Sequence, residues 1–589
     1  MTWRREADVV VVGSGAAGIS VALTAAARGL RVLVVTKDLV GGATPMAQGG
    51  LAAALGAGDT PTAHVADTLV AGAGLCSPEV VEALAESAPG TIGWLTGLGA
   101  RLETRDLRLE GGHSARRIVH SGDDATGAEV HRALLAALLA SGTEILDRTV
   151  ALDLIVSGTG AAESGLPVAD ERPVVGLLAG TIGADGSLTP GIVSARAVVI
   201  AAGGLGQAFD TTSNPAGATG DGIAIAARAG AVIRDLEFVQ FHPTVLWLPD
   251  ASGQCPLITE ALRGAGAVLR DLDGTLLMAG HDPRGDLAPR DVVAARMAEV
   301  IAAAGASACA GAGHVWLDAT GLGRDLLETG FPTVTAACRK HGIDPVTDLI
   351  PVAPGAHYSC GGIRADLDGR TSIPGLYAVG EAASTGVQGA NRLASNSVTE
   401  AIIAGRRTGS AIAGSLTGGE WAPEPGSGMR PADDPRSPTG PDRRGLARAM
   451  SRYAGVMRDA EGLAELLRIV GAADAPPGSL GQSASVAAGE SASQPDRLEL
   501  AAVEAANLRT VSLLIAAGAL RRAESRGCHR RRDAAETAAL PWHTLARWDG
   551  RELLLSEEIC DASAGIGLDA RAPMHAGTRH EIVLSEEEL

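Results

Sequence analysis

Short hydrophobic runs alternate with helical patterns in the first part of the chain. Residues 7–37, ADVVVVGSGAAGISVALTAAARGLRVLVVTK, place a run of valines before a glycine turn, a small-residue helical stretch and a second hydrophobic run. This order predicts strand, tight turn, helix and strand, the opening unit of a doubly wound α/β domain. Gly13, Gly15 and Gly18 have the G-x-G-x-x-G spacing, which allows the turn, the approach of a pyrophosphate and close helix–strand packing. We therefore predict a dinucleotide site rather than a plain βαβ unit.

Two later segments repeat the strand–glycine pattern and indicate which dinucleotide is bound. A hydrophobic run ending at Ala202 leads through glycines to Gly220–Asp221–Gly222, which opens a helical pattern. Another run ends at Gly380–Glu381, and it precedes a helix that we expect to be capped by Ser395–Asn396–Ser397. The positive end of this late helix favours negative charge on a reduced flavin, so the pattern favours FAD over NAD.

Two charged residues at predicted strand ends each have two interpretations. The second strand ends in Thr36–Lys37, where many dinucleotide sites have an acidic residue that binds a ribose. Lys37 is either a solvated strand end or a neighbour of the adenosine half of the cofactor. Glu381 is either a solvated strand end or a cofactor contact, and the repeated strand–glycine pattern favours the contact.

The order of patterns divides the chain into parts. Between the two halves of the predicted FAD domain, strand-like runs mix with helical periodicity at 288–304 and 324–341. Stretches rich in Pro, Gly and Ser flank the later helical patterns, as in linkers and mobile insertions. The predicted parts are an FAD-binding domain (1–230 and 345–415), an inserted α+β capping domain (231–344), a linker (416–440), a C-terminal helical bundle (441–540) with a mobile insertion at 471–496, and a C-terminal extension (541–589).

Composition limits the cellular compartment and the binding partners that we expect for the protein. The chain has 589 residues and a net charge of −19, which argues against nucleic acid or an anionic membrane as partner. Its seven cysteines include no C-x-x-C pair, so no local zinc or iron–sulfur motif is present, and their scatter suits a reducing cytoplasm. The first strand begins almost at once and no run reaches the length of a membrane span, so we expect a cytoplasmic protein without a signal peptide. The sequence carries no signal for an oligomeric state.

Seven motifs after the glycine turn carry a resemblance to a known family. They are, in order, MAQGGLAAAL, EGGHSARRIVH, DLEFVQFHPTVL, TEALRGAGAVLRD, GDLAPRDVVAAR, APGAHYSCGGI and GEAASTGVQGANRLASNSVTEAI. With the turn they cover about residues 7–415, and ESRGCHRRR extends the match into the helical C-terminus. The chain resembles the flavoprotein family of succinate dehydrogenase, fumarate reductase and L-aspartate oxidase. The resemblance implies FAD and a four-carbon dicarboxylate substrate.

Three features are most similar to the aspartate oxidase branch. Respiratory members carry a histidine before AQGG that bonds covalently to the flavin, whereas residues 42–48 here are GATPMAQ, so the resemblance implies noncovalent FAD. Glu110 in EGGHSARR and the stretch LAPRDVV also resemble the aspartate oxidases. This branch implies oxidation of L-aspartate to iminosuccinate, with dioxygen (giving hydrogen peroxide) or fumarate as electron acceptor. Quinolinate synthase, on the route to NAD, is then the expected functional partner.

The resemblance also assigns candidate residues for the substrate. Arg392, as a bidentate fork, and His357 would bind one carboxylate, and His242 and Thr259 would hold the other. Glu110 would attract the ammonium group that distinguishes aspartate from succinate.

Three further residues are assigned to catalysis and a longer set to the cofactor. Arg290 would act at the carbon chain as a proton shuttle, with Glu260 and Arg263 as its relay. The implied cofactor-binding residues are Gly13, Ser14, Gly15, Ala16, Ala17, Gly18, Lys37, Ala43, Thr44, Met46, Ala47, Gln48, Gly49, Gly50, Val150, Ala151, Asp221, Glu381, Ser397 and Val398.

Each assignment has a simpler rival. The alternatives left open are a core histidine at His242, strand packing at His357, a surface ion pair of Arg290 with Asp286 or Asp291, a loop charge at Glu110, a helix-entry ion pair at Arg392 and a solvated basic face at 530–532. At the level of function, the alternatives are a soluble fumarate reductase or succinate dehydrogenase flavoprotein subunit, and a flavin-binding protein without turnover.

Overall fold

The computed structural model describes most of the chain. The described ranges are 2–122, 125–157, 172–249, 251–306, 313–418, 430–431, 442–471, 498–548, 553–560 and 578–584. The expected linker at 416–440 and mobile insertion at 471–496 lie largely outside these ranges.

The first sheet has eight strands and is parallel around the glycine turn. β1 pairs in parallel with β2 and β9, and β18 also pairs in parallel with β9, so a late segment returns to the sheet that the first residues begin. The remaining strands on the β9 side, β8, β7 and β20, are antiparallel. The strands are β1 (Trp3–Val12), β2 (Val32–Val35), β6 (Glu144–Leu146), β7 (Thr149–Val156), β8 (Val174–Ile182), β9 (Leu188–Ile200), β18 (Leu376–Ala378) and β20 (Arg430–Pro431).

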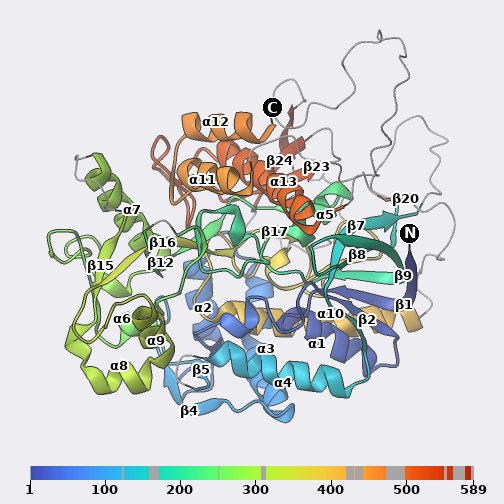
Figure 1. The fold of residues 1–589 in the computed structure, drawn as a ribbon, viewed down its shortest axis with the longest axis horizontal. Coiled ribbons are helices and arrows are strands. Elements are labelled where there is room, and N and C mark those ends of the chain that lie inside the picture. The colour runs from blue at the N-terminus through green and yellow to red at the C-terminus, as the bar shows by residue number, and fades with distance from the viewer. Residues whose placement is uncertain are drawn as a thin grey trace, which may run out of the picture.

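Helices cover both faces of this sheet because its central strands are hydrophobic on both sides. Along β1, Val9 and Val11 pack in one buried cluster and Val10 and Val12 in another, as successive strand side chains point to opposite faces. The first cluster includes side chains of α1 (Ala16–Ala26), α3 (Pro78–Gly97), α4 (Thr126–Ala140) and α10 (Asn396–Thr417), and the second includes those of α5 (Asp221–Arg228) and α13 (Leu500–Arg521). Figure 1 shows α1, α3, α4 and α10 below the sheet and α13 above it.

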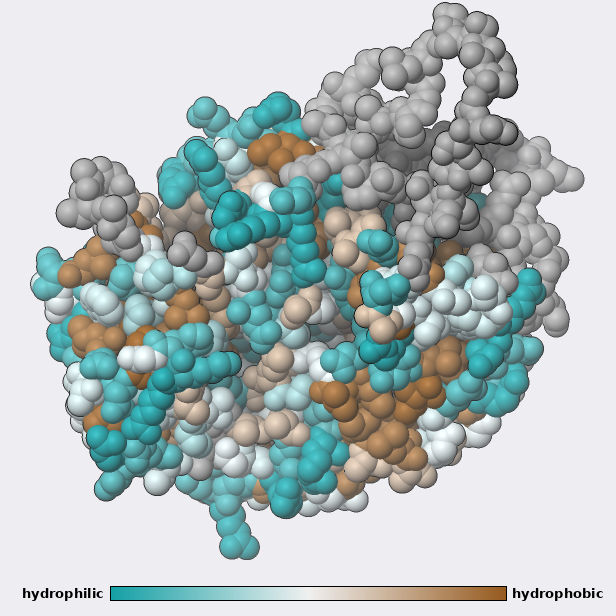
Figure 2. Space-filling view, in the orientation of Figure 1, coloured by the Kyte–Doolittle hydropathy of each residue, from teal (hydrophilic) through white to brown (hydrophobic). Residues whose placement is uncertain are grey.

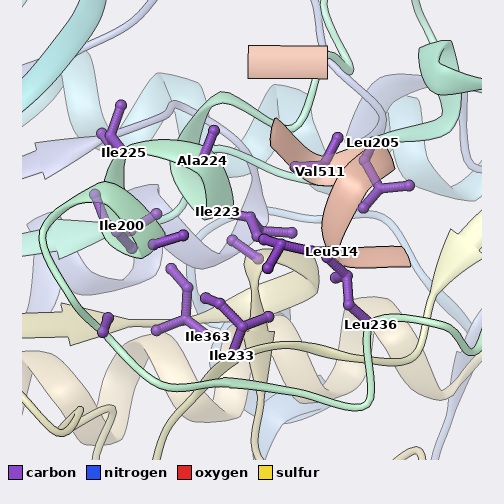
Figure 3. Packing of buried hydrophobic residues seen from close by; sticks show 14 of the residues in the cluster. Ile200, Leu205, Ile223, Ala224, Ile225, Ile233, Leu236, Ile363, Val511 and Leu514 are labelled. Carbon is purple, nitrogen blue, oxygen red and sulfur yellow. The ribbon is translucent and has the colours of Figure 1, made fainter. Parts of the chain in front are cut away.

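The contact between α13 and the sheet domain is made of aliphatic side chains. Val511 and Leu514 of α13 lie beside Leu205 and Ile223 in the buried cluster (Figure 3). α13 is also the one helix among the described residues that is long and apolar enough to cross a membrane, but 72% of its most apolar window is buried inside the protein. The helix therefore behaves as a core helix, and its hydrophobicity is accounted for by this packing.

Two glycines let α10 pack directly on α1. A Cβ at Gly405 would lie 2.5 Å from the carbonyl oxygen of Ala17, and one at Gly409 would lie 2.8 Å from that of Val21. Because the two backbones approach so closely, the start of α10 is fixed next to the helix that follows the glycine turn.

The second sheet has six strands and lies at the left of Figure 1. Its strands are β10 (Thr211–Thr212), β12 (Val239–Leu246), β13 (Gly253–Gln254), β14 (Val268–Arg270), β15 (Val315–Asp318) and β16 (Ile350–Ser359). A separate hydrophobic core joins it to α6 (Ala261–Gly264), α7 (Arg290–Ala306), α8 (Arg324–Gly330) and α9 (Pro332–Lys340). β16 pairs with β12 and β15, so residues 350–359 belong to this sheet although we expected the capping domain to end at 344.

A third sheet shows that the C-terminal part is not only helical. β23 (Trp542–Trp548), β24 (Leu553–Ile559) and β25 (Thr578–Leu584) add to β11 (Ile233–Arg234), β17 (Gly362–Arg364) and β19 (Ala383–Ser384). The expected extension at 541–589 thus shares a sheet with β17 and β19 of the FAD-binding part, because β23 hydrogen-bonds to β11 and β11 pairs with β17. Two helices accompany α13 in the C-terminal part, namely α11 (Arg443–Tyr453) and α12 (Ala460–Gly471), with the short strands β21 (Met457–Arg458) and β22 (Arg530–Arg531).

The remaining elements form a small layer beside the first sheet. They are α2 (Pro61–Ala71) and the three-stranded sheet of β3 (Leu51–Ala52), β4 (Glu103–Arg108) and β5 (Ile118–His120). Hydrophilic residues cover much of the visible surface, and the most extensive of several gatherings of hydrophobic residues lies at the lower right of Figure 2.

Candidate active site

One cavity contains most of the residues predicted for the cofactor. It begins at the glycine turn between β1 and α1 and continues past the segment 41–50 to the start of α10. The predicted cofactor residues that line it are Gly13, Ser14, Gly15, Ala16, Ala17, Lys37, Ala43, Thr44, Met46, Ala47, Gln48, Gly49, Gly50, Glu381, Ser397 and Val398.

Four predicted cofactor residues do not line the cavity. Val150 and Ala151 are buried within β7, where they pack in two hydrophobic clusters, so the structure does not place them at the site. Gly18 serves packing, because a Cβ there would lie 2.0 Å from the carbonyl oxygen of Gly13. Asp221 does not line the cavity itself, but its carboxylate pairs with the lining residue Lys37 at 2.8 Å.

Lys37 is not a solvated strand end, because its side chain is paired with two carboxylates. Its ammonium group contacts Asp221 and Glu504, each at 2.8 Å. Burial opposes the charge, but these two carboxylates outweigh it and raise the pKa of Lys37. The residue therefore stays cationic at the wall of the cavity.

The glycine turn fits the pyrophosphate of FAD. Gly13 has φ +111°, and a Cβ there would lie 2.2 Å from the carbonyl oxygen of Ala201, so only glycine fits. α1 begins after Gly15, and although the N–H of Ala16 donates to the Thr44 hydroxyl at 3.0 Å, the first residues of the helix line the cavity, so its positive end faces the space for a phosphate. At the other end of the cavity, Gln48 Oε1 is buried and has no hydrogen-bond partner among the described residues. A polar group of a bound cofactor would satisfy it.

The substrate candidates line the same cavity. Glu110, His242, Thr259, Glu260, Arg290, His357 and Arg392 all contribute to its wall. They come from the loop after β4, the second sheet, the residues just before α6, the start of α7 and the loop before α10, so the fold gathers segments that are far apart in the sequence. Arg263 lies behind this wall, 3.6 Å from the Glu260 carboxylate, and donates to the carbonyl oxygen of Asp286.

The amide oxygen of Gln240 joins the two arginines of the cavity. Arg290 Nη1 and Arg392 Nη2 each donate to Gln240 Oε1 at 3.1 Å, and Gln240 is fully buried. Gln240 is not among the residues predicted from the sequence. The available signal was its position two residues before His242 on a strand, which puts both side chains on the same face.

Burial and mutual repulsion set the charges of these groups. Burial and the nearby Arg290 lower the pKa of Arg392 to about 10. Burial, helped by Arg290 and Arg392, lowers the pKa values of His242 and His357 well below the usual value, so both imidazoles are neutral. The N–H of Thr244 donates to His242 Nδ1 at 3.2 Å, which leaves the ring proton on Nε2 as a donor.

Arg290 pairs with Glu260 and not with either aspartate named as an alternative. Its Nε donates to Glu260 Oε2 at 2.7 Å, and the Arg290 side chain is nearly buried. Burial opposes ionisation of Glu260, but Arg290 and Arg263 outweigh it and lower its pKa. Asp291 bonds to Arg530 and Asn391, which rules out the surface-pair interpretation of Arg290.

Glu110 is a buried carboxylate rather than a loop charge. It is 7% exposed, and burial raises its pKa despite the neighbouring Arg290. The hydroxyl of Ser395 donates to it at 2.6 Å, and the N–H of Gly50 donates to the same hydroxyl at 3.1 Å. Ser395 precedes α10 with φ +59° and makes no side-chain cap, so the expected capping role is replaced by this contact.

The structure also contradicts the solvated interpretations of Glu381 and of the basic run 530–532. Glu381 is buried, burial raises its pKa to about 7, and it accepts a hydrogen bond from the N–H of Ser359, so it is not a solvated strand end. The basic run 530–532 is not a uniform solvated face. Arg531 is 4% exposed and donates to main-chain carbonyls, Arg530 is partly buried, and only Arg532 is largely exposed.

Comparisons with known proteins show which family this chain belongs to. The family model described as "FAD binding domain" matches residues 8–398, and one described as "Fumarate reductase flavoprotein C-term" matches residues 443–559. The chain is 46% identical over 562 residues to the L-aspartate oxidase of Streptomyces coelicolor, covering 92% of either chain. It is 41% identical over 555 residues to that of Caulobacter vibrioides, covering 92% of this chain and 96% of the relative.

Solved structures show the same fold over nearly the whole length. The FrdA chain of E. coli quinol fumarate reductase has a TM-score of 0.78 at 26% identity, covering 96% of this chain and 98% of that one. Sdh1 from Mycobacterium smegmatis has a TM-score of 0.72 at 28% identity, covering 99% and 94%. The predicted α/β fold class and the FAD cofactor are confirmed. The chain belongs to the L-aspartate oxidases, within the flavoprotein family of succinate dehydrogenase and fumarate reductase.

Proposed function

We propose that this protein oxidises L-aspartate to iminosuccinate in the cavity described above, with noncovalently bound FAD. FAD, when bound, supplies the hydride acceptor. The observation that carries the proposal is the single cavity in which Arg290, Arg392, His242 and His357 surround a space that a buried carboxylate, Glu110, also faces. A dicarboxylate with one ammonium group complements this set of charges.

The two carboxylates of the substrate are held by different donors. Arg392 and His357 hold one, and His242, through Nε2–H, and Thr259 hold the other. The two guanidinium groups repel each other in a buried site, and burial together with this repulsion lowers the pKa of Arg392. A dianionic carbon chain relieves that repulsion, so binding is favoured by charges that the free protein keeps unsatisfied.

Glu110 selects the amino acid and prepares it for oxidation. Burial leaves this carboxylate without full compensation, and a substrate ammonium supplies the missing positive charge. Its raised pKa also makes Glu110 a better acceptor for one ammonium proton. The lone pair of the neutral amine then forms the C=N bond as hydride leaves Cα, which gives the protonated imine, and loss of its extra proton gives iminosuccinate. Succinate lacks this group and would leave Glu110 buried without a partner.

Arg290 has a different task in each direction of the reaction. During aspartate oxidation the proton leaves the amine, so Arg290 acts on the carbon chain by its positive charge. During fumarate reduction it must give a proton to carbon, and Glu260 at 2.7 Å with Arg263 behind it forms the relay that restores that proton.

The electron acceptors and cellular partners follow from the same proposal. Dioxygen takes the electrons to give hydrogen peroxide, or fumarate takes them to give succinate. Quinolinate synthase consumes the product in NAD synthesis, and the protein works in the cytoplasm. Residues 231–344, extended by β16, form a cap over the site.

Anaerobic mixing tests the substrate. L-Aspartate should bleach the yellow absorbance of the flavin, and succinate should not. Bleaching by succinate alone would overturn the proposal. Glu110→Gln should reduce the rate with aspartate far more than fumarate reduction, whereas equal losses would remove its role in selectivity. Acid precipitation should release the yellow cofactor into the supernatant, since residues 42–48 offer no histidine for a covalent bond.

A further inference from the structure

A second cavity lies on the other side of the two active-site arginines. Its volume is about 300 Å³, at the small end of the range of ligand pockets (about 300–1,000 Å³). Arg290 and Arg392 line both cavities, so their side chains form the shared wall. The lining comes from the end of α2 and the residues after it (70–73), the glycines at 111–112, the approach to α7 and its first turn (284–292), the loop at 391–394 and the C-terminal residues 525–537.

The lining of this second cavity is strongly cationic. Five arginines line it, and Asp291 is the one carboxylate among the described lining residues. The arginines are Arg284, Arg290, Arg392, Arg526 and Arg530. Three of them have carboxylate partners that do not line the cavity, because Arg284 pairs with Asp282 at 2.9 Å, Arg290 with Glu260 at 2.7 Å and Arg526 with Glu524 at 3.0 Å. The guanidinium groups therefore line the cavity while these counter-charges stay outside its wall.

Arg284 and Arg530 are the accessible members of this set. The Arg284 side chain is 49% exposed and that of Arg530 is 32% exposed. Arg530 contacts Asp291 through Nη2 at 2.6 Å. Among the described residues, Nη1 of Arg284 and Nη1 of Arg530 have no hydrogen-bond partner, so each of these partly exposed side chains has a donor for an incoming anion.

The net negative charge of the protein opposes the approach of an anionic substrate, and a cationic cavity would offset this repulsion locally. A net charge of −19 repels a dicarboxylate at long range, while the active-site clamp lies buried behind the wall. A cleft lined by cations with low-dielectric walls focuses the field and raises the local concentration and on-rate of an anion. We propose that the second cavity is the entrance through which the dicarboxylate substrate reaches the clamp, and that Arg284 and Arg530 capture it there.

A purely structural role of Arg530 is the main rival. Asp291, which Arg530 holds, accepts a hydrogen bond from Asn391 Nδ2, and Asn391 Oδ1 accepts one from Gln240. Loss of Arg530 could therefore disturb the clamp through this chain of contacts. Arg284 offers an independent test, because its guanidinium group pairs with Asp282 and makes no described contact to Asn391 or Gln240.

Anaerobic stopped-flow reduction of the flavin by L-aspartate separates capture from chemistry. Arg284→Gln, Arg530→Gln and the double variant are compared with wild type over a range of ionic strength. We expect the apparent second-order rate constant to fall about 3-fold in each single variant and about 10-fold in the double variant at low salt. The limiting rate at saturating aspartate should stay unchanged, and salt should remove the differences. Arg530→Lys should keep most of the wild-type rate.

Arg324→Gln is the matched control. Arg324 lies in α8, its side chain is 55% exposed, it pairs with Glu328 at 2.9 Å, and it lines neither cavity. We expect wild-type kinetics and salt dependence from this variant.

Two outcomes would overturn the proposal. One is an unchanged second-order rate constant in the double variant at low salt. The other is a fall in the limiting rate with no change in salt dependence, which would show a structural role. The inference rests on the clamp proposed above, and that premise has its own readout, because wild-type bleaching that survives intact in Arg392→Gln would show that the clamp, rather than the entrance, is misplaced.

Discussion

The hydroxyl of Ser395 donates a 2.6 Å hydrogen bond to the carboxylate of Glu110, across 285 residues of sequence. Ser395 holds this position with φ +59°, a conformation that is costly for a residue other than glycine. A Cβ at Gly49 would lie 3.0 Å from Glu110 Oε1 and 3.2 Å from the Ser395 hydroxyl, so a side chain there would crowd the pair. The strained serine and the adjacent glycine together fix this carboxylate in the wall of the cavity.

Ser395→Gly should separate the effect of the Ser395 hydroxyl on activity from the effect of the strained backbone conformation on stability. Glycine accepts φ +59° without strain, so the thermal unfolding temperature should not fall. Loss of a hydrogen bond to a charged group costs about 1.5–3 kcal/mol, which corresponds to about a 10- to 100-fold lower kcat/KM for aspartate. Because that bond favours the ionised carboxylate, the pKa of Glu110 should rise further. The acidic limb of the pH profile for aspartate should therefore move to higher pH.

The pH profiles of two variants test whether the Ser395 hydroxyl affects the pKa of Glu110. In Glu110→Gln the limb that reports Glu110 should disappear. A Ser395→Gly profile identical to wild type would show that the hydroxyl does not tune the carboxylate.

Arg392→Lys should show whether the fork geometry of the guanidinium group matters. Arg392 donates to Gln240 and to the hydroxyl of Ser397, and its guanidinium carbon lies 5.0 Å from the ring centroid of Tyr358. A lysine keeps the charge but has neither a planar fork nor the stacking. We expect KM for aspartate to rise about 10-fold or more, with a larger loss in Arg392→Gln. Equal kinetics for arginine and lysine would mean that only the charge is needed.

Gly13→Ala should abolish FAD binding. The new methyl group would lie 2.2 Å from a backbone oxygen and at φ +111°, so the turn between β1 and α1 cannot persist. The purified variant should lack the flavin absorbance, and it should unfold at a lower temperature. Gly90→Ala in α3 is the control, because nothing lies within 4 Å of its Cβ position. This change should leave FAD binding intact and alter stability by no more than about 1 kcal/mol.

The buried pair of His543 and Asp235 should make stability depend on alkaline pH. Burial opposes the charge on His543, but the Asp235 carboxylate outweighs it and raises the pKa of His543 to about 9. The usual value is about 6.5. A raised folded-state pKa stabilises the protein fully below the unfolded pKa, and that contribution is lost as pH rises through 9. His543→Gln should cost about 2 kcal/mol at pH 6 by thermal or urea unfolding, and much less at about pH 10. A loss that does not vary with pH would assign the effect to packing.

The sequence by itself determined the local chemistry of the cofactor half. The glycine spacing at residues 13–18 predicted a turn that admits no Cβ, and the structure has that turn for steric reasons that act within one βαβ unit. The alternating burial of Val9 to Val12 followed from the period of a strand in the same way. The substrate candidates were named by resemblance and not by pattern, because no local rule connects Glu110 to Arg290 or Arg392.

Only the tertiary structure decided which side chains meet. Gln240 as the common acceptor of Arg290 and Arg392, and Ser395 as the partner of Glu110, depend on three segments that the sheets bring together. Val150 and Ala151 fell outside the cavity for the same reason, since their burial depends on neighbouring strands and not on their own sequence. The strands β23 to β25 also escaped prediction, because their partner β11 lies about 300 residues away. Short-range steric constraints depend on residues that are adjacent in the sequence. The charges of a buried site depend instead on the groups that the folded chain places beside them.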